Sequence, residues 1–190
     1  MTQPAARELL HTRSITIRGY RRVDGLFDIE AQLTDTKSYG FDNLDRGHVA
    51  PGEPLHGMLA RLTVNEDMLI VAAEAATEYG PFAICPGGAE SFARLAGLTV
   101  APGFLKLAGQ RLAGTIGCTH LRELLQQMAT TALQTMVVVR TKRAPAPTHN
   151  EAPQRPRLLD SCYAYASDRE AVRRRWPAFY TGPRVEGTET

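Results

Sequence analysis

The stretch THLRELLQQMATTALQTMVVV, residues 119–139, decides the fold class of this chain. Its apolar residues recur at the three- and four-residue spacing that lines one side of an α-helix. They are Leu121, Leu125, Met128, Ala132, Met136 and Val139, and Leu124 and Leu133 widen the stripe. Thr119 is an acceptable N-cap residue for this helix. A helix with one apolar stripe must bury it against another element, so the rest of the chain has to provide a surface.

Two predicted β-hairpins precede the helix and provide that surface. In the first, β-rich runs at about 14–22 and 27–38 flank Asp24-Gly25, a pair suited to the positive φ angles of a tight turn. In the second, runs at about 55–64 and 68–77 flank a turn at 65–67. A Gly/Asp/Pro loop over 39–53 joins the hairpins, and shorter helical segments follow at 87–97 and 102–114.

Strands followed by helices, without βαβ alternation, indicate an α+β fold. We expect an antiparallel sheet of four or more strands, with the long helix packed on one face. This core domain is predicted over residues 1–143. A Pro-rich linker or strap follows at 144–157, and an arm at 158–190 carries Trp176, Phe179 and Tyr180 for docking on the core or on a second subunit. A homodimer is the expected assembly.

The composition is that of a soluble globular protein. The chain has 190 residues, of which 43% are hydrophobic and 22% charged, and its formal net charge is +2. So small a charge argues against nucleic acid or an anionic membrane as the main partner. No apolar run approaches the ~20 residues of a membrane span, and the first residues lack the pattern of a secretory signal. Cys85, Cys118 and Cys162 are odd in number and widely spaced, which predicts reduced thiols and a cytoplasmic protein.

Polar residues continue the apolar faces of two predicted strands. Side chains alternate across a strand, so the face that carries Phe27, Ile29, Ala31 and Leu33 runs on into Asp35, Lys37 and Tyr39. The face of the next strand that carries Met58, Ala60, Leu62 and Val64 begins with His56. If the two strands are antiparallel neighbours, these polar residues converge at one rim of the sheet, where pKa shifts are common.

Pairing across the predicted turns adds three residues to this rim, and together with Met58 they are the four candidate substrate-binding residues. Glu74 is placed opposite Met58, on the His56 face, and Arg18 and Tyr20 are placed on the face of Ile29 and Asp35. The alternative is that these polar residues are solvated structural side chains at the end of a sheet.

Cys118 and His120 form a second candidate group, at the start of the long helix. The field of a helix N-terminus favours a thiolate, and Gly114 and Gly117 let the backbone approach a ligand closely. The alternative is a small buried hydrophobe followed by an ordinary helix-start histidine. A zinc site using Cys85, Cys118, His120 and His56 is also open. Cys-x-x-Cys and His-x-x-x-His spacings are absent from the sequence, so we predict neither a metal nor another cofactor.

Several segments together resemble a bacterial domain-of-unknown-function family, number 2889. They are GYRRVDGLFDIEAQLTDTKSYGF, RGHVAPGEPLHGMLARLTV, PFAIC and GCTHLRELL, and they span about His11 to Thr135, roughly two thirds of the chain. The resemblance implies a small cytoplasmic bacterial protein associated with the catabolism of aromatic and acyl compounds. It implies no catalytic residue list, although all six candidate catalytic residues lie in the resembling segments.

The leading hypothesis is a cofactor-independent lyase or isomerase acting by general acid/base catalysis on a small, apolar, aromatic substrate. His56 is the expected base, with Asp35 in the same rim. Lys37 and Tyr39 stabilise negative charge, and Cys118 with His120 closes the pocket. A non-catalytic ligand-binding or assembly module and a zinc-dependent hydrolase are the alternatives.

Overall fold

The structure is a computed structural model that describes residues 5–143 and 154–183. The chain divides into two compact units, Met1–Ala144 and Pro145–Thr190, and each is described by itself. Most of the linker predicted at 144–157 lies outside the described residues. Docking of the C-terminal arm and dimerisation stay predictions.

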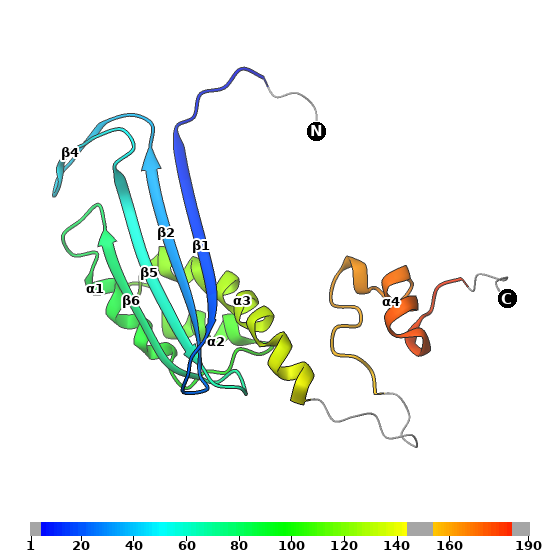
Figure 1. Cartoon of the computed structure of the whole chain (residues 1–190). Coiled ribbons are helices and arrows are strands. Elements are labelled where there is room, and N and C mark those ends of the chain that lie inside the picture. Colours follow the sequence, from blue (N-terminus) through cyan, green and yellow to red (C-terminus); the bar gives the residue numbers. More distant parts are fainter. Residues whose placement is uncertain (1–4, 144–153, 184–190) are drawn as a thin grey trace. The chain divides into compact units, whose positions relative to one another are not determined.

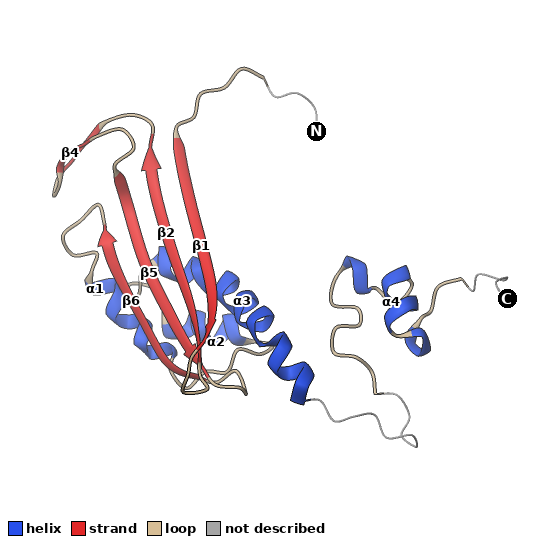
Figure 2. Ribbon diagram, in the orientation of Figure 1, coloured by secondary structure: helices blue, strands red, loops and turns tan. Residues whose placement is uncertain are grey.

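Unit 1 is built on a four-stranded antiparallel sheet with helices on one face (Figure 1, Figure 2). In sheet order, its strands are β1 (His11–Arg21), β2 (Phe27–Lys37), β5 (Pro54–Val64) and β6 (Ile70–Tyr79). The predicted α+β fold is therefore confirmed. Ile29 lies opposite Leu62 and Leu33 opposite Met58, and all four side chains are buried on the helix-covered face.

The segment predicted as a loop between the two hairpins contains a small hairpin of its own. β3 (Phe41–Asn43) pairs with β4 (Gly47–Val49). The Asn43 side chain accepts hydrogen bonds from the backbone N–H groups of Asp45 and Arg46, which holds the turn. Strands of three residues are too short for alternation to reveal them in a sequence.

The helices follow in the second part of unit 1. They are α1 (Gly87–Glu90), the 3₁₀ helix η1 (Ser91–Leu95), α2 (Phe104–Arg111) and α3 (Thr119–Arg143). The predicted stripe of α3 is buried at Leu121, Leu124, Leu125, Met128, Ala132 and Met136. Leu133, predicted to widen it, is instead 45% exposed.

A glycine lets α3 approach the edge strand β1. Gly19 lies opposite Ile29 on the covered face of the sheet. A methyl group in its place would collide with the side chain of Thr135 on α3. The absence of a side chain at this position therefore sets how closely the helix and the strand pack.

The register between β1 and β2 differs from the predicted one. The expected two-residue turn at Asp24-Gly25 is a three-residue loop, closed by a 2.9 Å hydrogen bond from Arg22 N to Leu26 O, with Gly25 at φ +86°. One residue more in a loop turns every side chain of the strand to the other face. Arg18 and Tyr20 thus lie opposite Glu30 and Asp28 on the open face, and the prediction for them was wrong.

Glu74 was also assigned to the wrong face. With regular pairing from the loop onward, Glu74 would lie on the same face of the sheet as Met58. The pairing register between β5 and β6 shifts between Thr63 and Val64, where β6 has one unpaired extra residue. Met58 consequently lies opposite Thr77, and Glu74 pairs with Arg61 on the open face.

Unit 2 has short helical elements: η2 (Tyr163–Tyr165), α4 (Glu170–Arg175) and η3 (Pro177–Phe179). The rings of Tyr165 and Trp176 lie 5.1 Å apart, and the Arg175 guanidinium lies over both. Aromatic and cation–π contacts thus contribute to this small unit.

Candidate active site

A buried carboxylate, Asp35, is the centre of the polar cluster in unit 1. It continues the core face of β2 immediately after Leu33, and its side chain is only 1% exposed. An isolated buried carboxylate would be costly, so it needs partners of opposite charge or hydrogen-bond donors. The neighbouring elements provide them from both sides of β2.

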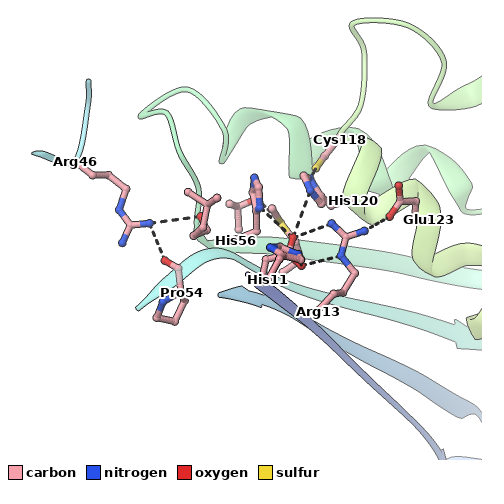
Figure 3. Close-up of polar contacts among 12 residues, drawn as sticks. His11, Arg13, Arg46, Pro54, His56, Cys118, His120 and Glu123 are labelled. Carbon is pink, nitrogen blue, oxygen red and sulfur yellow. Dashed lines mark hydrogen bonds and ion pairs between the residues drawn. The ribbon is translucent and has the colours of Figure 1, made fainter. Parts of the chain in front are cut away.

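Arg13 on β1 is the principal partner of Asp35. It lies directly opposite Asp35 in the ladder. Its Nε donates to Oδ1 at 2.7 Å and its Nη2 donates to Oδ2 at 2.8 Å, which is a bidentate ion pair (Figure 3). The remaining Nη1 of Arg13 contacts Glu123 of α3 at 2.6 Å, and His11 Nε2 lies 3.3 Å from Asp35 Oδ1. The pair therefore links β1, β2 and α3.

His56 on β5 contacts Asp35 from the other side. The two residues are opposite each other in the β2–β5 ladder, and His56 Nδ1 lies 3.1 Å from Asp35 Oδ2. An ionised carboxylate only accepts hydrogen bonds, so Nδ1 carries the proton in the neutral ring. The Nε2 atom of His56 is then left with a lone pair, as a general base requires.

His120 and Cys118 bring the start of α3 to the same carboxylate. The rings of His56 and His120 have their centroids 4.0 Å apart, and His120 Nε2 lies 3.7 Å from Asp35 Oδ2. Cys118 Sγ lies 3.9 Å from His120 Nδ1. Figure 3 shows His56, Cys118 and His120 gathered at one end of the sheet.

Two glycines allow α3 to start at this position. A methyl group at Gly88 of α1 would lie 3.4 Å from Cys118 Cβ, and one at Gly117 would lie 3.0 Å from Ser91 Oγ. The carbonyl of Cys118 accepts the hydrogen bond of Arg122 N at 3.1 Å. Cys118 is therefore the N-cap residue, rather than the expected Thr119.

Charge compensation keeps Asp35 ionised. Burial raises the pKa of Asp35, but the hydrogen bonds and charge of Arg13, together with the charges of His56 and His11, outweigh it and leave the pKa below its ordinary value. His56 behaves differently: burial, followed by the charge of His120, lowers its pKa below 6.5 despite the opposing effect of Asp35. At neutral pH the site thus holds a carboxylate against a neutral imidazole.

The structure brings four of the predicted catalytic residues together and leaves two beside them. Asp35, His56, Cys118 and His120 form the cluster. Lys37 Nζ instead donates to Tyr39 Oη at 3.1 Å and lies over the rings of Tyr39 and Phe41. Lys37 follows Asp35 by two residues, about 7 Å along the strand.

Three of the four residues predicted to bind substrate lie on the face of the sheet opposite the cluster. Arg18 and Tyr20 occupy the open face of the sheet, as does Glu74. Met58 lies on the covered face but is buried in the core, where Thr77 Oγ1 contacts its sulfur at 3.4 Å.

Sequence reasoning missed His11, Arg13 and Glu123. The signal for Arg13 was its position two residues before Ile15 and four before Ile17, which share the inward face of β1. A cation that continues an apolar face opposite a buried carboxylate is the expected partner, but only the correct register reveals it.

The cluster also contains a set of atoms close enough to hold a metal ion. Within residues 5–143 and 154–183, one oxygen of Asp35 and one nitrogen each of His56 and His120 lie within 4.8 Å of one another. Cys85 and Cys118, considered as zinc ligands from the sequence, are not in this set. Arg13 already donates to both Asp35 oxygens, and its positive charge opposes a dication there.

The fold and the cluster define a class: α+β proteins with a carboxylate–histidine site at one end of an antiparallel sheet. The chain belongs to the family described as "Protein of unknown function (DUF2889)", whose sequence model matches residues 11–134. All cluster residues lie in this range, whereas unit 2 lies beyond it. Comparison with curated proteins and with solved structures gave no match. Among the described residues, no helix is long and apolar enough to span a membrane.

Proposed function

We propose that this protein is an enzyme that performs general acid/base catalysis on a small, largely apolar substrate, with His56 as the base. The observation that carries the proposal is the contact between Asp35 and His56. A buried, ionised carboxylate holds Nδ1–H of a neutral imidazole, which directs the basic Nε2 away from it. A histidine held in one tautomer by a carboxylate is a recurrent way to position a proton-transfer group.

The proposed reaction is proton transfer next to a carbonyl or phenol, in a lyase or isomerase. His56 Nε2 removes the proton, and the developing negative charge needs a nearby donor or cation. Lys37, two residues after Asp35 on β2, donates a hydrogen bond to the Tyr39 hydroxyl, and we assign this cation and hydroxyl to that role. The edge-to-face rings of Tyr39 and Phe41, 6.3 Å apart, favour an aromatic substrate, which would pack against them. None of these steps requires a cofactor.

The test is a turnover screen over aromatic acids, alcohols and thioesters, run in deuterated water to detect exchange next to the carbonyl. Wild-type protein is expected to turn over or exchange at least one class, and His56→Gln is expected to lose that activity. Tight binding without turnover or exchange would support the alternative of a ligand-binding module.

A zinc-dependent hydrolase is the second candidate, because Asp35, His56 and His120 place suitable atoms within 4.8 Å of one another. We favour the acid/base proposal over it, since Arg13 occupies both oxygens of the carboxylate that zinc would need.

A further inference from the structure

The geometry points to a second chemical group in the same cluster: we propose that Cys118 is a nucleophile that accepts acyl groups from small esters or thioesters, with His120 as its base and Asp35 as the group that orients His120. This proposal gives the cluster a second reaction, hydrolysis through an acyl-cysteine, beside the proton transfer proposed above. It rests on the proposed function in one respect: His56 acts as the base in the hydrolysis of the acyl-cysteine.

The order of contacts matches what an activated thiol needs. Cys118 Sγ lies 3.9 Å from His120 Nδ1, and the other nitrogen of the same ring, Nε2, lies 3.7 Å from Asp35 Oδ2. A nucleophile, a base within reach, and a third group that orients the base form the general arrangement of covalent catalysis. Such contacts are often long before substrate binds and shorten in the complex.

The position of Cys118 in the chain favours a reactive thiol. The residue is neither fully buried nor fully exposed, and it packs against the edge of the core. It is also the N-cap residue of α3, a helix of 25 residues, where the helix dipole stabilises a thiolate. The first-turn N–H groups of a helix lack partners within the helix, so they can donate to the oxyanion of a tetrahedral intermediate.

The proposed reaction has two halves. In the first, the thiol proton moves to His120 Nδ1, and the sulfur attacks the carbonyl carbon. Collapse of the tetrahedral intermediate breaks the bond to the leaving alcohol or thiol, which takes the proton from His120. In the second, His56 Nε2 takes a proton from water as the oxygen attacks the acyl-cysteine; the C–S bond then breaks, and the leaving thiolate receives that proton from His56, which returns to its neutral form. The net reaction is hydrolysis of an acyl ester or thioester, with water as co-reactant.

The two neighbouring histidines give each half of the reaction its own base. Both contact the same oxygen of Asp35, at 3.1 Å for His56 and 3.7 Å for His120, and His120 also contacts the Cys118 sulfur at 3.9 Å. Loss of His120 should therefore slow acylation, whereas loss of His56 should slow deacylation.

The test uses p-nitrophenyl acetate and a Cys85→Ala/Cys162→Ala background, in which Cys118 is the remaining thiol of the three in the sequence. We expect a burst of p-nitrophenolate close to one equivalent, and one acetyl group on the Cys118 peptide by mass spectrometry. Cys118→Ser should abolish the acetylated thiol, and His120→Asn should slow the burst by about 100-fold or more. Circular dichroism confirms that each variant is folded.

Three further outcomes separate the two proposals. No acylation of Cys118 in the folded background protein, or a burst unaffected by His120→Asn, overturns the nucleophile. A burst that persists in His56→Gln, with slow steady-state release and accumulated acyl-enzyme, supports both proposals. A burst with unchanged steady-state release in His56→Gln supports Cys118 as the nucleophile and contradicts His56 as the base.

Discussion

Arg13 and Asp35 face each other across the β1–β2 ladder and form a bidentate ion pair, with N–O distances of 2.7 and 2.8 Å. The pair has two consequences for the cluster. It keeps a carboxylate charged at a position where the side chain is 1% exposed. It also connects the edge strand β1 to α3, because Arg13 contacts Glu123 as well. The site and the packing of the helix on the sheet thus share one interaction.

Removal of Arg13 should destabilise the fold because it leaves a buried charge without its main partner. Arg13→Met is expected to lower the free energy of unfolding by about 3 kcal/mol, near the low end for a buried pair because Arg13 is itself partly exposed. Chemical denaturation at pH 7 measures this. The double variant Arg13→Met/Asp35→Leu should recover part of the loss, since the unpaired charge is gone.

Arg61→Met is the matched control for Arg13→Met. Arg61 pairs with Glu74 across the open face, where the side chains are 45% and 61% exposed. Exposed ion pairs contribute less than about 1 kcal/mol. Equal losses for Arg13→Met and Arg61→Met would contradict the importance assigned to the Arg13–Asp35 pair.

If His56 is the base, its substitution should reduce activity strongly and stability only slightly. His56→Gln should reduce turnover of any substrate found in the screen by about 100-fold or more. Its free energy of unfolding should change by about 1 kcal/mol, the scale of one hydrogen bond, because Arg13 still compensates Asp35. Steady-state kinetics and denaturation of the same preparations provide both values. Early unfolding with full activity of the folded fraction would make His56 a structural residue.

The lowered pKa of His56 predicts a specific pH dependence of stability. The unfolded chain takes up a proton near pH 6.5, whereas folded His56 does so only at lower pH. Between these values the unfolded state binds more protons, so stability should fall as the pH drops through about 6.5. His56→Gln should reduce this slope. Asp35 acts in a separate window: its lowered pKa contributes stability above about pH 4, which is lost at more acidic pH.

Close packing at Gly19 predicts a large cost for a very small substitution. Gly19→Ala places a methyl group against Thr135 and should destabilise the protein by about 1–3 kcal/mol. Thermal unfolding measures the change, and Gly19→Ala/Thr135→Ala should recover part of it. Gly109→Ala in α2 is the control: a methyl group there meets no atom within 4 Å, so alanine should be neutral or stabilise the helix by up to about 1 kcal/mol. Similar results for Gly19 and Gly109 would contradict the packing argument.

Metal analysis tests the choice between acid/base and metal-dependent chemistry. Protein purified without added metal is expected to contain substoichiometric zinc, because the Arg13 cation competes for both oxygens of Asp35. Elemental analysis measures the content, and Arg13→Met provides a comparison in which that competition is removed. A stoichiometric ion that is present in the wild-type protein and lost in His120→Asn would favour metal-dependent hydrolysis over both metal-free proposals.

The sequence by itself determined the fold class and the core of the site. The apolar spacing of α3 and the alternation of β2 and β5 are local patterns, since each depends on the geometry of a single helix or strand. Alternation alone put Asp35 and His56 on the covered face, and the structure pairs them directly. The predicted helix and the four predicted strands all correspond to elements of the sheet and its covering layer.

Only the tertiary structure decided which residues join Asp35 and His56. The loop before β2 is one residue longer than predicted, which puts Arg18 on the open face of the sheet. The extra residue in β6 does the same for Glu74. Local propensities carry little information on whether the pairing register of two strands shifts by one residue. Such a shift nevertheless turns every following side chain to the other face of the sheet. Arg13, and not Arg18, is therefore the arginine of β1 that lies opposite Asp35. His120 reaches Asp35, and Cys118 reaches His120, because α3 packs on the sheet; this long-range packing is encoded by no short stretch of sequence.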